Sequence, residues 1–238
     1  MNDSREIILS ADGSSTLKLN EFDECFHSIN GALSESLHIY INSGLEYYIE
    51  NRGELLIFEM GFGTGLNAFL TLLFAKLHPW VKINYLTIEK FPLKEVEYES
   101  LNYPEKVAVL PAYTCLEDIP EGYFADRFNA LHKASWGLRQ DLLPNFSLTK
   151  SQGDLLGLDL DDGKVDIIYY DAFSPNIQPE LWGENVFEKL YRWLVPGGIL
   201  VTYSSKGVVK QALRDSGFLV RRLPGPAGKK HIVRAIRP

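Results

Sequence analysis

Carboxylates at the ends of apolar runs are the residues of this sequence best suited to chemistry. Glu59 stands near the end of the apolar run 55–60, and Gly61, Gly63 and Gly65 follow it at every second position. Glycines at a corner between a strand and a helix let the backbone approach a ligand closely, and the start of a helix carries partial positive charge. The pattern therefore predicts a turn that binds a cofactor.

The spacing of these glycines distinguishes between classes of cofactor. In the dinucleotide fingerprint Gly-x-Gly-x-x-Gly the third glycine comes one residue later, where this chain has Leu66. No Lys-Ser/Thr pair follows, which excludes a P-loop. An acid before Gly-x-Gly-x-Gly suits S-adenosylmethionine (SAM), which has no pyrophosphate and carries an ammonium and a sulfonium. A nucleotide site and a structural turn are the alternatives.

Two further acids extend this predicted site. Glu89 ends the second apolar run, at the place of the ribose-binding acid in nucleoside sites. The alternative is a surface Glu-Lys pair. Asp154 precedes the next strand, where an acid often takes the adenine amino group in SAM folds, although Gly-Asp is also a common turn. We expect both acids at the cofactor.

A fourth acid, Asp171, follows the apolar run 165–170. Tyr170, Phe173 and Trp182 flank it, and prolines fix the loop that follows. A carboxylate among aromatic rings can hold an amine and accept its proton while a flat base stacks nearby. The alternative is that Asp171 caps the next helix and that the rings belong to the core.

The elements that must position these acids alternate between strand and helix. The apolar runs predict strands at 55–60, 82–90, 106–110, 165–170, 198–204, 218–223 and 231–237. The segments between them predict helices at 64–77, 92–100, 179–194 and 208–216. Such alternation predicts a doubly wound α/β sheet. Only a turn separates the last two strands, so we expect them to form an antiparallel hairpin.

Two segments fall outside this alternation. Residues 1–50 predict a small N-terminal appendage that contains a helix, and residues 51–238 predict the main domain. Within the main domain, residues 113–150 are long and rich in aromatic residues. We interpret them as an insertion over the carboxyl edge of the sheet, where open α/β sheets bind ligands.

The composition is that of an ordinary soluble protein. The 238 residues are 45% hydrophobic and 23% charged, with no run near the roughly 18 apolar residues of a membrane span. The N-terminus lacks a signal-peptide pattern. Cys25 and Cys115 form no pair at metal-ligand spacing. We therefore expect a cytoplasmic protein without a metal site.

The charge is distributed unevenly along the chain. The net charge is −7, yet the segment from Lys206 to the C-terminus carries nine Lys or Arg and one acid, Asp215. That segment is +8, which leaves −15 for the rest. Such asymmetry indicates a surface that binds a polyanion. The alternative is a solvated helix and hairpin that happen to be basic.

Six segments together resemble the tRNA 5-methylaminomethyl-2-thiouridine methyltransferases. They are HSINGALSESLHIYI, EMGFGTGLN, QGD, DAFSPNIQPELW, PGGILVTYSSKG and PGPAGKK. The resemblance covers nearly the whole chain, and Asp-Ala-Phe-Ser-Pro is its most specific part. In some bacteria this activity is fused to an FAD-dependent oxidase domain. This chain is too short for that half, so the resemblance implies the stand-alone methyltransferase.

The resemblance implies a class I SAM-dependent methyltransferase fold and a reaction. SAM would methylate the amine of 5-aminomethyl-2-thiouridine at the tRNA wobble position, with Asp171 as the active-site acid. The cofactor-binding residues that it implies are Glu59, Gly61, Phe62, Gly63, Gly65, Asn67, Glu89 and Asp154. The substrate-binding residues are Phe26, His27, Tyr170, Phe173, Ser174, Pro175, Lys229 and Lys230. Of these, Lys229 and Lys230 would grip phosphates of the tRNA anticodon arm together with Arg221 and Arg222.

The sequence departs from the family pattern in its N-terminal part and in one loop. Phe26 stands where the family usually has tyrosine, and Asn30 where we expect histidine. The basic loop reads Gly-Lys-Lys-His from Gly228, in place of Gly-Lys-Arg-Glu. These differences concern the contacts of the N-terminal part and leave the fold prediction unchanged.

Two other hypotheses compete with this one. A small-molecule amine transferase of the same fold, such as an aminopropyltransferase or a metabolite N-methyltransferase, would share the glycine loop but has no use for the basic tail. A non-catalytic RNA-binding protein would need neither the intact acid–glycine loop nor Asp171.

Overall fold

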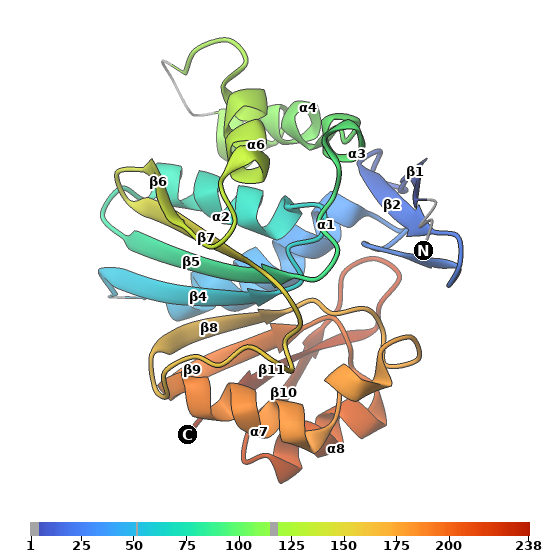
Figure 1. Ribbon diagram of the computed structural model, residues 1–238, viewed down its shortest axis with the longest axis vertical. Helices are drawn as coiled ribbons and strands as arrows, with labels where there is room; N and C mark the ends of the chain where they lie inside the picture. Colours follow the sequence, from blue (N-terminus) through green and yellow to red (C-terminus); the bar gives the residue numbers. More distant parts are fainter. Residues whose placement is uncertain (1–4, 51, 115–118) are drawn as a thin grey trace.

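The computed structural model describes residues 5–50, 52–114 and 119–238, so Cys115 lies outside the described residues. An eight-stranded mixed sheet has the order β10-β11-β9-β8-β4-β5-β7-β6 (Figure 1). Its five middle strands run parallel. They are β9 (Leu194–Thr202), β8 (Val165–Tyr170), β4 (Glu54–Met60), β5 (Lys82–Glu89) and β7 (Phe146–Gln152). The predicted doubly wound α/β sheet is confirmed.

Antiparallel strands close both edges of the sheet. At one edge β10 (Leu219–Pro224) and β11 (His231–Ile236) form the predicted hairpin, and β11 pairs with β9. At the other edge β6 (Arg139–Leu143) pairs with β7. The carboxyl ends of the parallel strands therefore meet at one end of the molecule, which is where open α/β sheets bind ligands.

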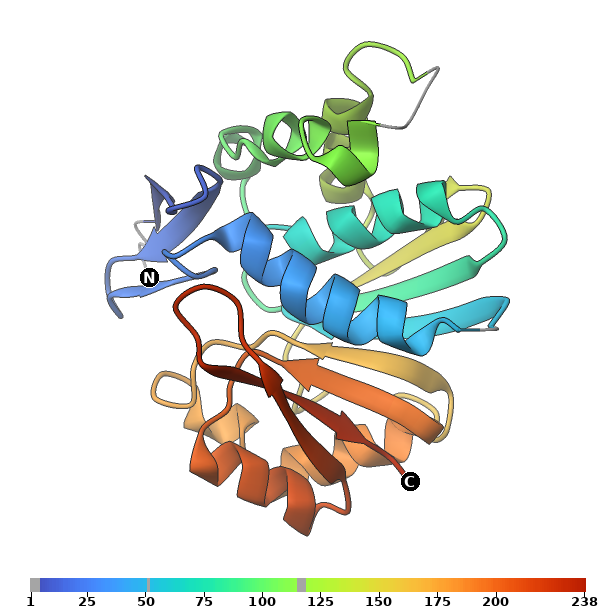
Figure 2. The ribbon, with the colours of Figure 1, turned by 180° about the vertical axis from the view of Figure 1, so that it is seen from behind.

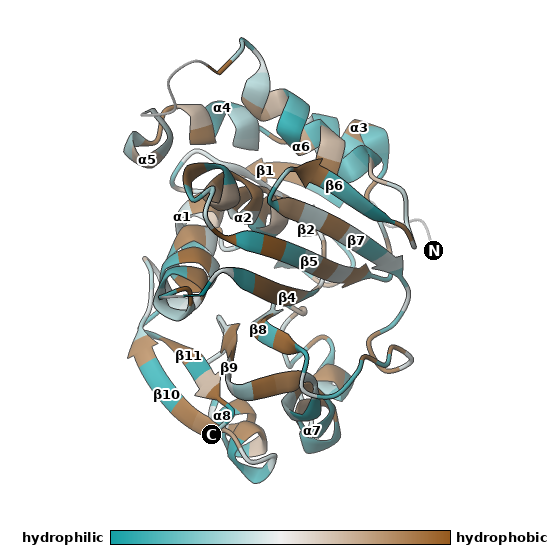
Figure 3. Ribbon diagram, turned by 90° about the vertical axis from the view of Figure 1, so that its left-hand side faces the viewer, coloured by the Kyte–Doolittle hydropathy of each residue, from teal (hydrophilic) through white to brown (hydrophobic). Residues whose placement is uncertain are grey.

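The central strands are apolar on both faces because helices cover both. One face packs against η1 (Leu37–Glu46) and α2 (Leu66–Leu77), and the other against α7 (Glu184–Trp193) and α8 (Gly207–Asp215). Figure 3 shows β4 and β8 as mainly hydrophobic. Successive side chains of a strand point to opposite faces. Tyr169 therefore packs beside Tyr40 of η1, and Tyr170 beside Phe187 of α7.

The N-terminal segment forms a small sheet and then joins the main helical layer. Strands β1 (Arg5–Leu9), β2 (Ser15–Leu19) and β3 (Glu24–Cys25) are antiparallel. Helix α1 (Ala32–Ser36) leads into the π-helix η1, and both lie beside α2 (Figure 2). A Cβ at Gly44 would lie 3.1 Å from Val201 Cγ2, so this glycine lets η1 approach the sheet closely. The domain boundary near residue 50 stays a prediction.

One predicted strand is wrong, and the predicted insertion contains β6 and the start of β7, two strands of the sheet. Residues 106–110 belong largely to α4 (Tyr103–Ala108), in which Tyr103 and Val107 lie one helical turn apart and are both fully buried. The third parallel strand is instead β7, which begins at Phe146 inside the segment 113–150. The shorter helices of this region are α3 (Glu95–Glu99), α5 (Pro111–Thr114), α6 (Tyr123–Lys133) and η2 (Pro179–Leu181).

No helix within residues 5–50, 52–114 and 119–238 is long and apolar enough to cross a membrane. In the same ranges no group of three His, Cys, Asp or Glu side chains could hold a metal ion. Cys25 is a free thiol.

Candidate active site

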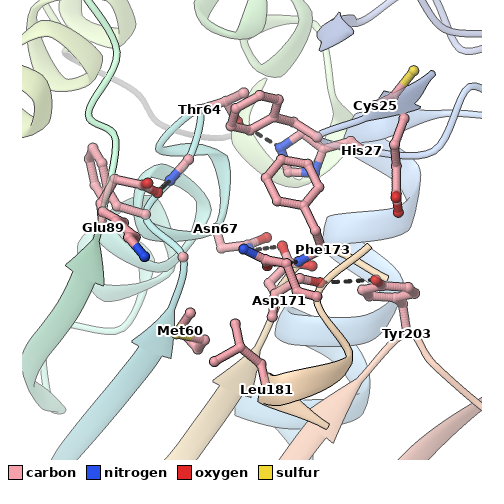
Figure 4. A pocket seen from close by; sticks show the side chains of 18 of the residues that line it. Cys25, His27, Met60, Thr64, Asn67, Glu89, Asp171, Phe173, Leu181 and Tyr203 are labelled. Atoms are coloured by element: carbon pink, nitrogen blue, oxygen red, sulfur yellow. Dashed lines mark hydrogen bonds between the residues drawn. The ribbon is translucent and has the colours of Figure 1, made fainter. Parts of the chain in front are cut away.

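A cavity of about 370 Å³ lies at the carboxyl ends of β4, β5 and β8. Its volume falls in the range of about 300–1,000 Å³ that small-molecule sites have. Figure 4 shows Glu89 on one side of the cavity, Asp171 and Phe173 on the other, and Asn67 between them. We call the side that holds the glycine loop (residues 61–65), Glu89 and Asp154 the cofactor half. The acceptor half is the side that holds Phe26, Glu35, Asp171, Phe173, Tyr203 and Lys229.

The backbone of the glycine loop is fixed close to its neighbours. Gly61 and Gly63 have φ angles of 88° and 50°, in the left-handed region that favours glycine. A Cβ on Gly61 would lie 3.1 Å from the carbonyl oxygen of Asp171. The Gly61 N–H donates to Ile88 O at 3.1 Å, and the Gly63 N–H donates to Glu89 Oε2 at 2.9 Å. The loop is therefore held against β5 by its own amides.

The two acids of the cofactor half are oriented by backbone amides. Glu89 Oε1 accepts the Phe91 N–H at 2.8 Å, in addition to its bond with the glycine loop. Each carboxylate oxygen keeps lone pairs that can accept hydroxyl donors such as a ribose diol. Asp154 Oδ1 accepts the Leu156 N–H at 3.0 Å, and its Oδ2 accepts Lys90 Nζ at 2.8 Å. The bond from Lys90 lowers the pKa of Asp154, which keeps this acid ionised.

Asp171 follows β8 directly and is held by donors from two helices. Tyr40 of η1 donates its hydroxyl to Asp171 Oδ1 at 2.6 Å, and Asn67 of α2 donates Nδ2 to Asp171 Oδ2 at 2.8 Å. Burial raises the pKa of Asp171 to about 6, although these two hydrogen bonds lower it. A carboxyl with this pKa can gain and lose a proton near neutral pH.

Aromatic rings line the acceptor half beside Asp171. The rings of Phe26 and Phe173 meet edge to face at 5.1 Å. Trp182 Nε1 donates to Phe173 O at 2.8 Å, and the Tyr203 hydroxyl donates to Ala172 O at 2.9 Å. The loop after Asp171 is therefore fixed on two sides, and its rings can flank a flat base.

Lys229 does not lie where a phosphate contact was predicted. Its ammonium forms an ion pair with Glu35 of α1 and stands 4.9 Å from the centre of the Tyr203 ring. Glu35 is buried and also accepts the Ser28 N–H at 2.9 Å. Lys229 is therefore part of the wall of the acceptor half, and its predicted grip on the anticodon-arm phosphates does not fit this position.

Several predicted site residues do line the cavity, and others lie off its wall. Those on the wall are Gly61, Phe62, Gly63, Asn67, Glu89, Asp154, Asp171, Phe26, His27, Phe173 and Lys229. Those off the wall are Glu59, Gly65, Tyr170, Ser174, Pro175 and Lys230.

The alternation of side chains along a strand explains why Glu59 and Tyr170 lie away from the cavity. Glu59 points toward α2, between Thr87 and Tyr169 of the adjacent strands, and is fully buried. Burial raises the pKa of Glu59 well above its ordinary value, and the side chain lies beneath the loop. Tyr170 points toward α7 and donates its hydroxyl to Leu181 O. Direct contact of Glu59 with SAM, or of Tyr170 with the substrate, does not fit this geometry.

The others off the wall have different surroundings. Gly65 lies at the start of α2 against His132, and Ser174 donates to the carboxylate of Glu24 through its hydroxyl at 3.0 Å and its N–H at 3.1 Å. Lys230 is exposed on the loop between β10 and β11.

Sequence reasoning missed residues that the tertiary structure brings to the cavity. Glu35 lines the cavity, and Tyr40 lies behind its wall as a donor to Asp171; both come from the N-terminal helices, where the sequence predicted only a helix. Tyr203 directly follows β9 at the same sheet edge as Asp171, and this position could have revealed it.

Comparison with known proteins agrees with this geometry. Residues 148–238 match the model of a family described as S-adenosyl-L-methionine-dependent methyltransferase. The crystal structure of MNMC2 from Aquifex aeolicus has a TM-score of 0.75 and 26% identity, over 98% of this chain and 70% of that one. The chain has the class I SAM-dependent methyltransferase fold. The predicted fold class is confirmed, and these similarities support the methyltransferase assignment and the SAM cofactor.

Curated relatives extend the similarity along almost the whole chain. Two are the tRNA 5-methylaminomethyl-2-thiouridine biosynthesis bifunctional proteins MnmC of Pseudomonas entomophila (strain L48) and Cupriavidus metallidurans. The first is 31% identical, over 88% of this chain and 32% of its own length. The second is 30% identical, over 94% of this chain and 33% of its own length. The chain thus spans about a third of these relatives. The resemblance predicted from the sequence is confirmed, whereas the stand-alone form stays a prediction.

A more distant similarity concerns the fold alone. The spermidine synthase from Thermotoga maritima has a TM-score of 0.50 and 14% identity, over 94% of this chain and 69% of that one. The aminopropyltransferase hypothesis therefore has the weaker support.

The residues of the cofactor half fit SAM. Glycines stand where the loop backbone borders the cavity, and Glu89 offers two fixed acceptors to a diol. Asn67 also lines the cavity, and its Nδ2 donates to Asp171. When bound, SAM supplies a methyl group activated by its sulfonium.

Proposed function

We propose that the chain transfers a methyl group from SAM to the amine of 5-aminomethyl-2-thiouridine at the wobble position of tRNA. The observation that carries the proposal is Asp171, a carboxyl with a pKa of about 6 held by Tyr40 and Asn67 where the glycine loop meets aromatic rings. The similarity of nearly the whole chain to proteins named for 5-methylaminomethyl-2-thiouridine biosynthesis in tRNA supports it.

The chain's own residues would prepare the amine for attack. An aminomethyl group is mostly protonated at neutral pH and then has no lone pair. Asp171 accepts the ammonium proton, directly or through water, while Tyr40 and Asn67 keep its carboxylate aimed at the cavity. The amine nitrogen would then be neutral and would hold the lone pair that methyl transfer needs. Phe26 and Phe173 flank the flat uracil.

The surface cations near the C-terminus would grip the anticodon arm. Desolvation and the nearby charges of Arg222, Lys230 and Lys210 lower the pKa of His231, which shows that these cations gather around β11. Arg221 is also exposed on β10, although alternation along the strand turns its side chain to the opposite face from that of Arg222. Cations of this kind bind phosphates and leave base recognition to the pocket. We place the protein in the cytoplasm, with tRNA as its partner.

The test is methyl transfer from labelled SAM to two bulk tRNA pools, one that carries 5-aminomethyluridine and one that lacks it. We expect label only in the first pool, recovered as the methylaminomethyl nucleoside. Equal label in both pools would reject the target base and keep a tRNA methyltransferase. No label in either pool, with SAM still bound, would favour a small amine as the acceptor.

A further inference from the structure

Thr64 of the glycine loop is held by two histidines from distant parts of the chain. His132 at the end of α6 has its Nε2 3.1 Å from Thr64 O. His27, which follows β3, has its Nε2 2.6 Å from Thr64 Oγ1. Thr64 itself is 1% exposed. The loop is therefore fixed from outside the strand–loop–helix motif as well as from within it.

The protonation state of His132 follows from its partner. Burial lowers the pKa of His132 to about 3 and that of His27 to about 4, so both rings are neutral at pH 7. A neutral imidazole has one N–H donor and one acceptor nitrogen. Because a carbonyl oxygen only accepts, His132 carries its proton on Nε2 and donates it to Thr64 O.

The packing around His132 explains the third glycine of the motif. The His132 ring stacks on Tyr98 with 4.1 Å between ring centres and meets the Phe62 ring edge to face at 5.2 Å. A Cβ on Gly65 would lie 2.8 Å from His132 Nε2. Gly65, which lies off the cavity wall, is thus needed for the approach of the histidine rather than for contact with the cofactor.

A buried lysine fixes the end of the helix that carries His132. Lys150 of β7 is 1% exposed, and its Nζ donates to Leu131 O at 2.8 Å and to His132 O at 2.6 Å. The ammonium also lies 4.6 Å from the centre of the Trp136 ring. A cation at the C-terminal end of a helix is favourable because the last carbonyls carry partial negative charge. Lys150 therefore locks α6, and with it His132, onto the sheet.

We propose that His132 is a positioning residue for SAM binding, which holds the glycine loop through Thr64 in the conformation that the cofactor needs. The bond lowers the cost of ordering the loop when SAM binds. The proposal also gives a function to α6 and β7, which would support the glycine loop on the side away from the cavity. The inference depends on SAM binding and not on the identity of the acceptor.

The test compares two substitutions of His132 by calorimetric titration with SAM. His132→Leu removes the donor, and we expect the Kd for SAM to rise about tenfold, since one hydrogen bond to a buried carbonyl is lost. His132→Gln places an amide N–H near the original Nε2, and we expect its Kd to stay within about threefold of wild type. At saturating SAM, kcat should change by less than about threefold in both variants, because His132 acts on the loop and not on the reaction.

Backbone hydrogen exchange supplies a readout that does not involve activity. The amides of residues 63–67 should exchange faster in His132→Leu than in wild type, and His132→Gln should restore their protection. If His132→Leu does not fold, His132→Asn replaces it, since its shorter side chain cannot reach Thr64 O.

Leu131→Ala is the matched control, because Leu131 is fully buried on the same helix and its side chain makes no hydrogen bond to the loop. We expect a lower melting temperature and an unchanged Kd for SAM. The proposal is overturned if His132→Leu binds SAM as wild type does. It is also overturned if Leu131→Ala weakens SAM binding as much as His132→Leu, because the effect would then be one of stability alone.

Discussion

The cofactor half and the acceptor half of the cavity are assembled in different ways. In the cofactor half, Glu89 holds Gly63 through a backbone amide 26 residues away in the chain. In the acceptor half, Tyr40 reaches Asp171 across 131 residues, and Lys229 reaches Glu35 across 194. The core of the cofactor half thus comes from the loop after β4 and from the end of β5, the next strand along the chain, while Asp154 and the two histidines that hold Thr64 come from farther away. The acceptor site exists only where the N-terminal helices, β8 and the C-terminal hairpin meet.

The sharpest test of this division is a pair of matched substitutions, one in each half. Asp171→Asn removes the proton acceptor, so we expect kcat to fall by about 10²–10⁴-fold while the Kd for SAM stays within about threefold. Glu89→Gln removes charge from the predicted diol contact, so we expect the Kd for SAM to rise about tenfold with little change in kcat. Steady-state kinetics and calorimetric titration separate the two effects. A large loss of SAM binding in Asp171→Asn would break the division.

The acceptor half should also make stability depend on pH. The pKa of Asp171 in the folded protein, about 6, exceeds its ordinary value of 3.8, so the folded state holds the proton more tightly. Its contribution to stability is fully present below about pH 4 and is lost as the pH rises through about 6. We expect this loss to be about 2–3 kcal/mol. Urea unfolding of wild type and Asp171→Asn from pH 4 to 7 measures it, and parallel pH curves would contradict it.

A third comparison concerns two buried tyrosine hydroxyls, one bonded to Asp171 and the other to a backbone carbonyl of the core. The hydrogen bond from Tyr40 lowers the pKa of Asp171, so Tyr40→Phe, which removes this donor, should raise that pKa. We therefore expect the acid limb of kcat to move to higher pH and kcat at pH 7 to fall about tenfold. Tyr170→Phe removes a core hydroxyl, so it should cost about 1 kcal/mol of stability and leave the pH profile unchanged. Equal pH profiles for the two variants would remove Tyr40 from the acceptor site.

The smallest expected effect concerns tRNA binding, which should distinguish the exposed cations from Lys229 in the cavity wall. Arg222→Glu with Lys230→Glu should weaken tRNA binding about fivefold near physiological salt and reduce the salt slope by about 2, with KM for SAM unchanged. Lys229→Met should leave the slope nearly constant, because its ammonium is paired with Glu35. Filter binding of tRNA across a salt series measures both. If Lys229→Met alone changes the salt dependence of tRNA binding, Lys229 contacts phosphates after all.

Most of the fold could be predicted from the sequence, because buried parallel strands are continuous apolar runs with turns between them. The runs at β4, β5 and β8 and the C-terminal hairpin were found in this way. Residues 106–110 misled the prediction because a short apolar run fits a strand and a buried helical turn equally well. Only packing, which buries Tyr103 and Val107 on one helical face, decides between them.

The sequence by itself also predicted the acids and glycines of the cofactor half and singled out Asp171 as a candidate, since each lies in a recognisable local pattern. The tertiary structure alone decided which of these side chains reach the cavity. Glu59 and Asp171 both stand at strand ends, yet the alternation of side chains buries the first beneath the loop and leaves the second on the wall. The partners of Asp171, Lys229 and Thr64 come from distant segments, and no local pattern encodes contacts that arise only when the whole chain packs together.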